Sequence, residues 1–305
     1  MKIKEKLNDI VSGLVKSMET AGTDWVKSWA GNGSINLVTK KGYRGINVLL
    51  LGYAKMKRCF KSSVWASFKQ WNDKGYMVSG QSESIIFFKQ TQKKIVDDDT
   101  GDTLLGDTYW MTRYYNVWNA DQVISKNYLD WITCNYRYKE PVKTASEVED
   151  NTDIDKYIEN TGAVIKHGFD GAFYSPALDY IGMPDKSAFI DTKDADSTGN
   201  YYGTKLHELS HWTGHKKRLN RFGKAPKAFA DNDYAYEELV AEISSAMLSI
   251  ELGLDHEPRP DHAKYLNCWI ARLKDDSGAL ISASTKAQQV LDYLDDMQDK
   301  KKAVA

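Results

Sequence analysis

Two histidines four residues apart, with a glutamate directly after the first, restrict the fold of this sequence more than any other feature. They lie in LHELSHWTGHKKRLNR, residues 206–221, as His207, Glu208 and His211. Residues i and i+4 lie on one face of an α-helix, so the two imidazoles can bind one metal ion. Glu208 can reach a water on that ion and act as a general base. The chain must therefore form a helix here and bring a further ligand to it.

The further ligand is expected from the strongest helix signal in the chain, DYAYEELVAEISSAMLSIELGL, residues 233–254. A zinc site that keeps an open position for water has three protein ligands. Glu238 and Glu242 are four residues apart and border the apolar stripe of this helix, so both can turn toward a packed neighbour. We predict Glu238 as the third ligand and Glu242 as a carboxylate that orients a ligand histidine. Two alternatives stay open: the reverse assignment, and a helix face on which both are only solvated.

The residues after the motif indicate which kind of metal site it forms. Gly214 follows the second histidine by three residues, where a short active-site helix has to end. A longer form of the motif has a third histidine at position 217, which is Lys217 here, so a glutamate ligand is favoured. Zn²⁺ is the expected metal, with Mn²⁺ or Co²⁺ as alternatives. The sequence does not choose among four candidates for holding an oxyanion, namely Tyr201, Tyr202, His215 and Tyr236.

The formal net charge of −1 conceals two oppositely charged halves. Residues 1–143 contain 22 Lys and Arg against 14 Asp and Glu, and residues 144–305 contain 19 against 28. The basic half also interleaves cations with aromatic side chains, the mixture that holds phosphates and stacks bases in single-stranded nucleic acid. The contrast can also arise from chance placement of surface charge. The candidates for contact with single-stranded DNA in this half are Trp25, Trp29, Lys40, Lys41, Tyr43 and Arg44.

Composition narrows the class of protein. No run approaches the roughly 18 apolar residues of a membrane span, so no membrane partner is expected. The three cysteines are odd in number and scattered, which argues against a disulfide framework and for the cytoplasm.

The periodicity of apolar residues predicts an α+β chain with a domain boundary in its middle. The polar stretch 140–157 has no apolar period and is interpreted as a linker, with its core at 144–157 between domains at 1–143 and 158–305. The first domain is expected to contain helices over 1–20, from Ile46, and over 62–75, and paired strands over 82–92 and 107–123. In the second domain, residues 170–189 predict two short strands with a turn at Ser175–Pro176. One of these strands can serve as an edge that holds an extended peptide.

Several of these segments together resemble the ArdC-type antirestriction proteins of plasmids and phages, which are related to TraC-type primases in their N-terminal region. The resemblance lies in AGTDWVKSW (21–29), GYRGINVLLL (42–51), FYSPALDYIGMP (173–184), the histidine motif, YEELVAEISSAML (236–248) and the C-terminal tail. It implies a mixed α/β single-stranded-DNA-binding domain followed by a mostly helical zincin-like metallopeptidase domain with a small sheet. It also implies His207 and His211 as ligands, Glu208 as catalytic base, and a DNA-facing or organising role for Arg44 and Asn47.

The expected function is protection of incoming mobile DNA from host restriction, in the bacterial cytoplasm. The peptidase would act on an unknown protein, which could be a host restriction component. One rival is a non-catalytic protein that coats single-stranded DNA and has a structural metal. The other is a primase-associated accessory protein, which is weaker because the chain shows no acidic cluster for nucleotidyl transfer.

Overall fold

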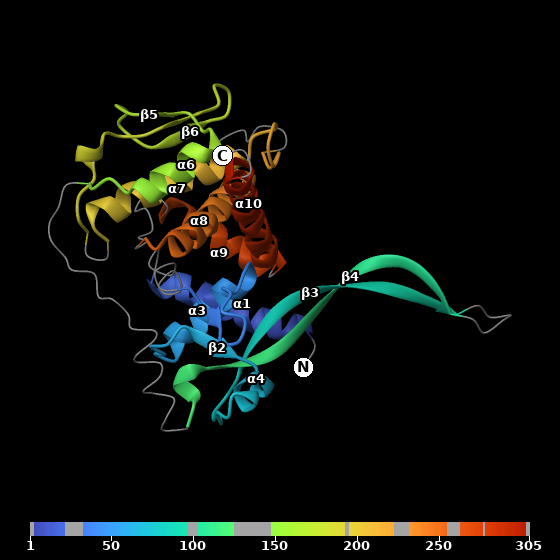
Figure 1. Cartoon of the computed structure of the whole chain (residues 1–305). Helices are drawn as coiled ribbons and strands as arrows, with labels where there is room; N and C mark the ends of the chain where they lie inside the picture. Colours follow the sequence, from blue (N-terminus) through green and yellow to red (C-terminus); the bar gives the residue numbers. More distant parts are fainter. Residues whose placement is uncertain are drawn as a thin grey trace.

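The computed structural model describes residues 3–21, 33–96, 103–124, 148–192, 195–222, 232–254, 263–276 and 278–302. The N-terminal elements lie in the lower part of the molecule in Figure 1, and the C-terminal helices and small sheet lie above them. Trp25 and Trp29, two of the predicted DNA contacts, lie outside the described residues.

The first half of the chain is a mixture of helices and strands. Its sheet has the order β1-β2-β4-β3, with β1 parallel to β2 and the other neighbours antiparallel. β3 and β4 continue beyond the sheet as a long two-stranded ribbon that leaves the body of the molecule (Figure 1). The elements are α1 (Ile3–Ala21), β1 (Ile35–Asn36), α3 (Ile46–Lys57), β2 (Val64–Ala66), α4 (Phe68–Asp73), β3 (Glu83–Val96) and β4 (Thr103–Asn119).

The single helix that the sequence predicts over 62–75 is wrong, because this segment is a strand followed by a short helix. β2 is fully buried between β1 and β4, where Trp65 and its neighbours suit a pleated core position. Ser67 then starts α4 with a capping box: its hydroxyl accepts from the Gln70 N–H at 3.3 Å, and the Gln70 side chain accepts from the Ser67 N–H at 3.0 Å. The cap fixes the start of the helix at Phe68, six residues later than predicted.

The second half is mostly helical and has one small sheet of order β5-β7-β6. β5 is parallel to β7, and β6 is antiparallel to β7. The predicted turn at Ser175–Pro176 separates β6 from β7. The elements are α6 (Thr152–Thr161), β5 (Ile165–Lys166), β6 (Phe173–Ser175), β7 (Tyr180–Gly182), α7 (Ser197–Thr213), α8 (Asn232–Leu252), α9 (Ala263–Asp275) and α10 (Gly278–Lys302).

The end of the predicted linker is not a linker but the first part of α6. Asn151 caps this helix by accepting from the Ile154 N–H at 3.1 Å, and Ile154 and Ile158 are buried. Two isoleucines four residues apart are not enough to show a helical period in so polar a stretch. Residues 125–147, which include the rest of the predicted linker, lie outside the described residues, so the domain boundaries stay a prediction.

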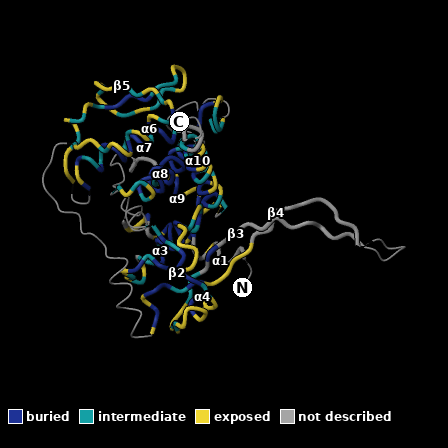
Figure 2. Tube along the Cα trace, viewed as in Figure 1, coloured by how far each residue is buried: buried dark blue, intermediate teal, exposed yellow. Residues whose placement is uncertain are grey.

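One hydrophobic core joins both halves of the chain. Buried residues concentrate where α7, α8 and α10 meet (Figure 2), and the same cluster includes Leu14 of α1 and Leu49 of α3. α1 packs on α9, and α3 packs on α10. The fold class is confirmed as α+β with a mostly helical second half. None of the helices in the described part of the chain is long and apolar enough to cross a membrane.

Candidate metal centre

The predicted metal helix is α7, and its ends are defined by specific residues. The Asp196 side chain accepts from the Gly199 N–H at 2.7 Å and so caps the N-terminus, and the helix ends at Gly214 as expected. α8 packs against α7, because its apolar stripe of Leu239, Ile243 and Ala246 is wholly buried. The packing brings the carboxylates that border this stripe toward the histidines of α7.

His207, His211 and Glu238 converge at the α7–α8 contact. The two Nε2 atoms are 3.1 Å apart. Glu238 Oε2 lies 3.5 Å from His207 Nε2, and Glu238 Oε1 lies 3.6 Å from His211 Nε2. Donors placed about 2.0–2.1 Å from a tetrahedral ion are about 3.3 Å from one another, so this spacing fits a single ion. These three residues offer ligand atoms that all lie within 4.8 Å of one another.

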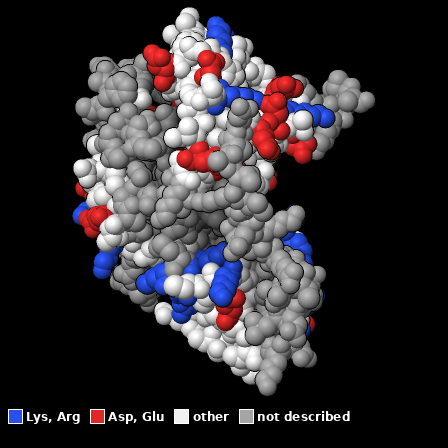
Figure 3. All heavy atoms as spheres, turned by 90° about the vertical axis from the view of Figure 1, so that its left-hand side faces the viewer, with Lys and Arg blue, Asp and Glu red and all other residues white. Residues whose placement is uncertain are grey.

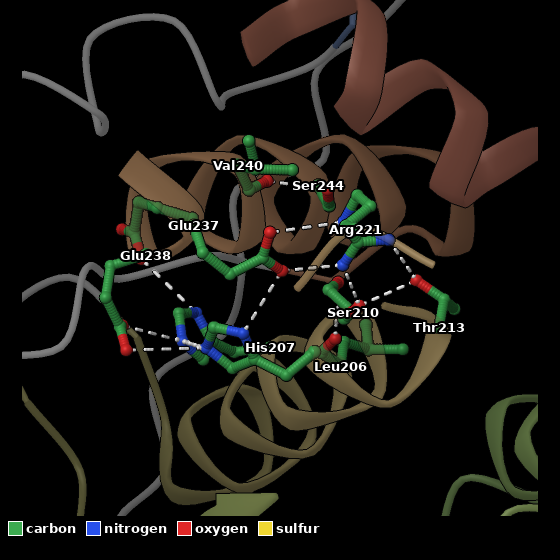
Figure 4. A network of polar contacts seen from close by, with 11 residues as sticks. Leu206, His207, Ser210, Thr213, Arg221, Glu237, Glu238, Val240 and Ser244 are labelled. Carbon is green, nitrogen blue, oxygen red and sulfur yellow. Dashed lines mark hydrogen bonds and ion pairs between the residues drawn. The ribbon is translucent and has the colours of Figure 1, made fainter. Parts of the chain in front are cut away.

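A second layer of carboxylates faces the other nitrogen of each imidazole. Glu242 Oε2 lies 3.6 Å from His207 Nδ1, and Glu237 Oε1 lies 3.5 Å from His211 Nδ1. A carboxylate at Nδ1 fixes the tautomer of a histidine and leaves Nε2 as the metal-binding atom. Three carboxylates of α8 thus have separate places: Glu238 lies near both Nε2 atoms (Figure 4), Glu237 faces His211 Nδ1, and Glu242 faces His207 Nδ1.

Arg221 holds Glu237 in place and was not predicted from the sequence. Its Nη2 and Nε donate to the two Glu237 oxygens at 2.7 and 3.2 Å, and its side chain is 4% exposed. The same guanidinium donates to the Ser210 carbonyl and to the Thr213 hydroxyl, both at 2.7 Å (Figure 4). A buried bidentate pair of this kind is rigid, so Arg221 ties the C-terminal end of α7 to α8.

Gly214 lets the chain after α7 turn back so that Arg221 lies beside the end of this helix. A Cβ atom at this position would lie 2.7 Å from Phe222 and 3.0 Å from Arg221 Nη2. Real Cβ atoms do not approach ring carbons so closely, so a larger residue would displace the segment that carries Arg221. The glycine therefore ends the helix and also makes room for the arginine.

The carboxylates strongly stabilise the charged forms of the histidines. Burial alone would lower the pKa of His211, but Glu238 and Glu237 raise it to about 10. Burial also acts to lower the pKa of His207, but Glu238 and Glu242 outweigh it and raise this pKa above its ordinary value. In turn, the pKa of Glu238 falls well below its ordinary value despite its burial. A positive charge is thus strongly favoured at this point, as expected of a cation site.

Glu208 is buried, with 3% of its surface exposed, and its charge contributes to the raised pKa of both histidines. The candidate oxyanion residues are engaged with other groups. Tyr201 OH lies 2.8 Å from His167 Nε2, Tyr202 donates to Asp155, and Tyr236 donates to Ser282. His215 is buried and its Nδ1 accepts from the Lys217 N–H at 3.2 Å, which agrees with a structural role.

β6 is an edge of the small sheet and lies beside α7. The turn that follows it is held by Asp179, which has a left-handed φ of 53°. Asp179 accepts from both Arg218 and the Tyr174 hydroxyl, and Arg218 also stacks on Trp212 at 3.8 Å. The sequence favours a turn role for Asp179. The structure adds an ion pair that fastens the sheet to the end of α7.

Replacing Asp179 with Asn should destabilise the protein in a pH-dependent way. The hydrogen bonds from Arg218 lower the pKa of Asp179 from 3.8 to about 2. A depressed folded pKa adds stability above the unfolded value and loses it as pH falls through the folded one. Because the side chain is 31% exposed, we expect about 1 kcal/mol at pH 7. Urea unfolding should show a difference from the unsubstituted protein that shrinks between pH 4 and pH 2, whereas a difference independent of pH would contradict this assignment.

The predicted DNA contacts that the structure describes lie around the start of α3. Lys41, Tyr43 and Arg44 line a common cavity. Lys40 is exposed in a left-handed turn with φ of 60°, and the Asn47 N–H donates to the Arg44 carbonyl at 3.3 Å. In Figure 3, most of the Lys and Arg on the face shown lie in its lower part, at the height of the N-terminal elements, and most of the Asp and Glu lie above.

Two family models match the chain in succession. The N-terminal domain of the anti-restriction factor ArdC matches residues 4–118, and a zincin-like metallopeptidase matches residues 152–286. Among solved structures, metal-free ArdC from the R388 plasmid has a TM-score of 0.75 and 29% identity, covering 96% of this chain and 98% of that one. Its Mn(II)-bound structure has a TM-score of 0.72 and 28% identity, covering 97% and 98%.

Two curated relatives match nearly the whole chain. The uncharacterized protein y4eC of Sinorhizobium fredii is 29% identical over 295 residues, which are 93% of this chain and 90% of that protein. The DNA primase TraC of Escherichia coli is 34% identical over 306 residues, which are 93% of this chain but only 26% of the primase. The matches define a zincin-like metallopeptidase domain that follows an ArdC N-terminal domain. The chain belongs to the ArdC-type antirestriction proteins.

Proposed function

We propose that this chain protects incoming DNA from host restriction by combining a metal-dependent peptidase site with a surface for single-stranded DNA. The observation that carries the peptidase is the convergence of His207, His211 and Glu238, with Glu208 buried next to the first histidine. Three protein donors and an adjacent carboxylate are the composition of a catalytic zinc site, whereas a structural site is closed by a fourth protein ligand. We assign the metal-ligand role to these three residues and the orienting roles to Glu242 and Glu237.

The residues of this chain have separate tasks in peptide hydrolysis. A bound metal polarises the scissile carbonyl and lowers the pKa of water. Glu208 takes the proton of the attacking water and delivers it to the leaving amine. The edge of β6 offers backbone groups to an extended peptide next to α7. Glu242 and Glu237 hold the two imidazole rings so that both Nε2 atoms point to one place.

Zn²⁺ is the metal we propose, because two imidazoles and one carboxylate suit it well. Mn²⁺ and Co²⁺ are compatible with the same donors, and the ArdC structure from R388 contains Mn(II). The proposed protein target is a component of the host restriction machinery.

The single-stranded-DNA function rests on the charge and side chains of the first half. Its excess of Lys and Arg over Asp and Glu is the electrostatic requirement for binding phosphates. The similarity to a DNA primase agrees with a partner of this kind. The proposed contacts are Lys40, Lys41, Tyr43, Arg44 and Asn47, together with Trp25 and Trp29.

Replacing Glu208 with Gln tests the peptidase. This change keeps the shape of the side chain and removes the base, so metal content and DNA affinity should stay within about twofold while base catalysis drops by about 10²–10⁴. Survival of unmodified DNA in a restricting host should fall to the level without the protein. If Glu208→Gln protects as well as the unsubstituted chain, the metal is structural and the protein acts by coating DNA.

A further inference from the structure

A cavity of about 520 Å³ lies where the first half of the chain meets α8 and α10, away from the metal site. One wall is the loop before α3, with Lys41, Tyr43 and Arg44. The other wall consists of α8 and α10, with Ile250, Glu251 and Leu291. Its volume falls within the range of about 300–1,000 Å³ typical of small-ligand sites. Neither the metal chemistry nor the peptide edge uses this space.

The two walls carry opposite charges. Lys41 is exposed on the first wall next to Arg44, and Glu251 and Asp295 lie on the second. Partial burial and the neighbouring Asp295 raise the pKa of Glu251, because both disfavour the charged form of this carboxyl. A ligand that suits the cavity therefore has an anionic end and an end that donates hydrogen bonds.

Apolar side chains occupy the space between the charged walls. Val48, Ile250 and Leu291 line the cavity together with the ring of Tyr43. Tyr43 is held in place by a hydrogen bond from Asn36 Nδ2 at 3.1 Å. Flat apolar and aromatic surfaces of this kind hold a base by stacking and exclude water from it. A nucleotide has all three properties: a phosphate, a flat ring and, on adenine, cytosine and guanine, an exocyclic amino group.

We propose that this cavity takes one nucleotide of a bound single strand, with its phosphate at Lys41 and Arg44 and its base directed toward Glu251. This inference rests on the proposed binding of single-stranded DNA and adds the place and the base contact. Adenine, cytosine and guanine donate through exocyclic amino groups, whereas thymine offers only its ring N3–H, so Glu251 gives the site a preference for the amino-bearing bases over thymine. A nucleotide in this position contacts both halves of the chain.

The ion pair that connects the two walls is weak enough for a phosphate to replace its carboxylate. Arg44 pairs with Asp292 across the junction, and the two side chains are 62% and 51% exposed. Ion pairs this exposed contribute little stability, so a phosphate can replace the carboxylate at small cost. The Gly45 N–H donates to Gln288 Oε1 at 2.9 Å and keeps the loop in place.

Two substitutions with one matched control test the cavity. A Cβ atom on Gly42, which lines the cavity, would meet nothing within 4 Å, so Gly42→Trp adds bulk there without a backbone clash. Lys41→Glu reverses a charge at the cavity, and Lys69→Glu reverses an exposed charge on α4 outside it. Affinity of the full chain for a fluorescent 12-mer of dC is measured by anisotropy at several salt concentrations, and thermal unfolding monitors the fold.

We expect Gly42→Trp and Lys41→Glu each to weaken binding by about tenfold, and Lys69→Glu by less than about twofold. If the unsubstituted chain binds no single-stranded DNA, the proposed function itself fails. If it binds and both charge reversals have equal effects while a folded Gly42→Trp binds normally, only the cavity is excluded. Should Gly42→Trp not fold, the comparison of the two charge reversals decides.

The base contact has its own measurement. The unsubstituted chain should bind a dC 12-mer about fivefold or more tightly than a dT 12-mer, and Glu251→Ala should remove that difference. Glu251 lies in the last turn of α8, where a change to Ala is tolerable for the fold. Equal affinity for both strands in the unsubstituted chain would overturn the base contact.

Discussion

Replacing Arg221 with Met is expected to destabilise the fold by about 3–5 kcal/mol, because it leaves the Glu237 carboxylate buried without its partner. Arg221 also donates hydrogen bonds to the Ser210 carbonyl and the Thr213 hydroxyl. The substitution therefore removes these two bonds and the pair with Glu237 at once, and all three hold the end of α7. Glu237 then no longer has a defined position behind His211. Metal affinity should fall by about 10- to 100-fold, the usual cost of losing a group that orients a ligand.

Chelator competition and urea unfolding of the metal-free protein separate the two effects. The double variant Arg221→Met with Glu237→Gln removes the unpaired charge, so it should recover much of the stability while metal affinity stays low. If Arg221→Met loses stability but binds metal as tightly as the unsubstituted chain, the pair serves the fold alone. Arg221→Lys keeps the charge without the bidentate geometry, so its stability and metal affinity should lie between those of the unsubstituted chain and those of Arg221→Met.

The sequence predicts which side chains meet between α7 and α8 because the essential information is local. His207 and His211 are one helical turn apart, and Glu238 and Glu242 are one turn apart on the next helix. A helical period and an apolar stripe fix which face each pair occupies, so packing of the two helices brings the four together. The structure places Glu238 at both Nε2 atoms and Glu242 at one Nδ1, the arrangement favoured from the pattern.

The features that the sequence did not predict depend on chain reversals or on long separations. Arg221 reaches back over α7 only because Gly214 leaves room, and no period relates it to Glu237. The break between β2 and α4 depends on one cap at Ser67, which outweighs a helical apolar pattern. The cavity joins Arg44 to residues more than 200 positions later, so no local signal indicates it.

The shared core has a consequence for how the two halves work together. α8 carries Glu238 near one end and Glu251 near the other, so the metal site and the cavity lie on the same helix. α10 packs along α8 and also carries Asp292, which pairs with Arg44. A strand bound in the cavity would therefore rest on the helix that carries Glu238, the proposed third metal ligand.

Glu238→Gln should reduce metal affinity by about 10³-fold, because one of three protein ligands loses its charge. The amide keeps the volume of the side chain, so the packing of α8 on α7 is retained. Metal content after dialysis against a weak chelator should fall from about one ion per chain to near zero. Affinity for single-stranded DNA, measured on the same samples, should not change, since Glu238 lies outside the cavity.

Glu242→Gln is the matched control, since it alters a carboxylate four residues away on the same helix edge. Glu242 faces His207 Nδ1 and not Nε2, so this variant should lose only about 10- to 100-fold in metal affinity. The order of the two losses decides the assignment. A larger loss in Glu242→Gln than in Glu238→Gln would make Glu242 the ligand and Glu238 the orienting group, and equal small losses would mean that neither carboxylate binds the metal.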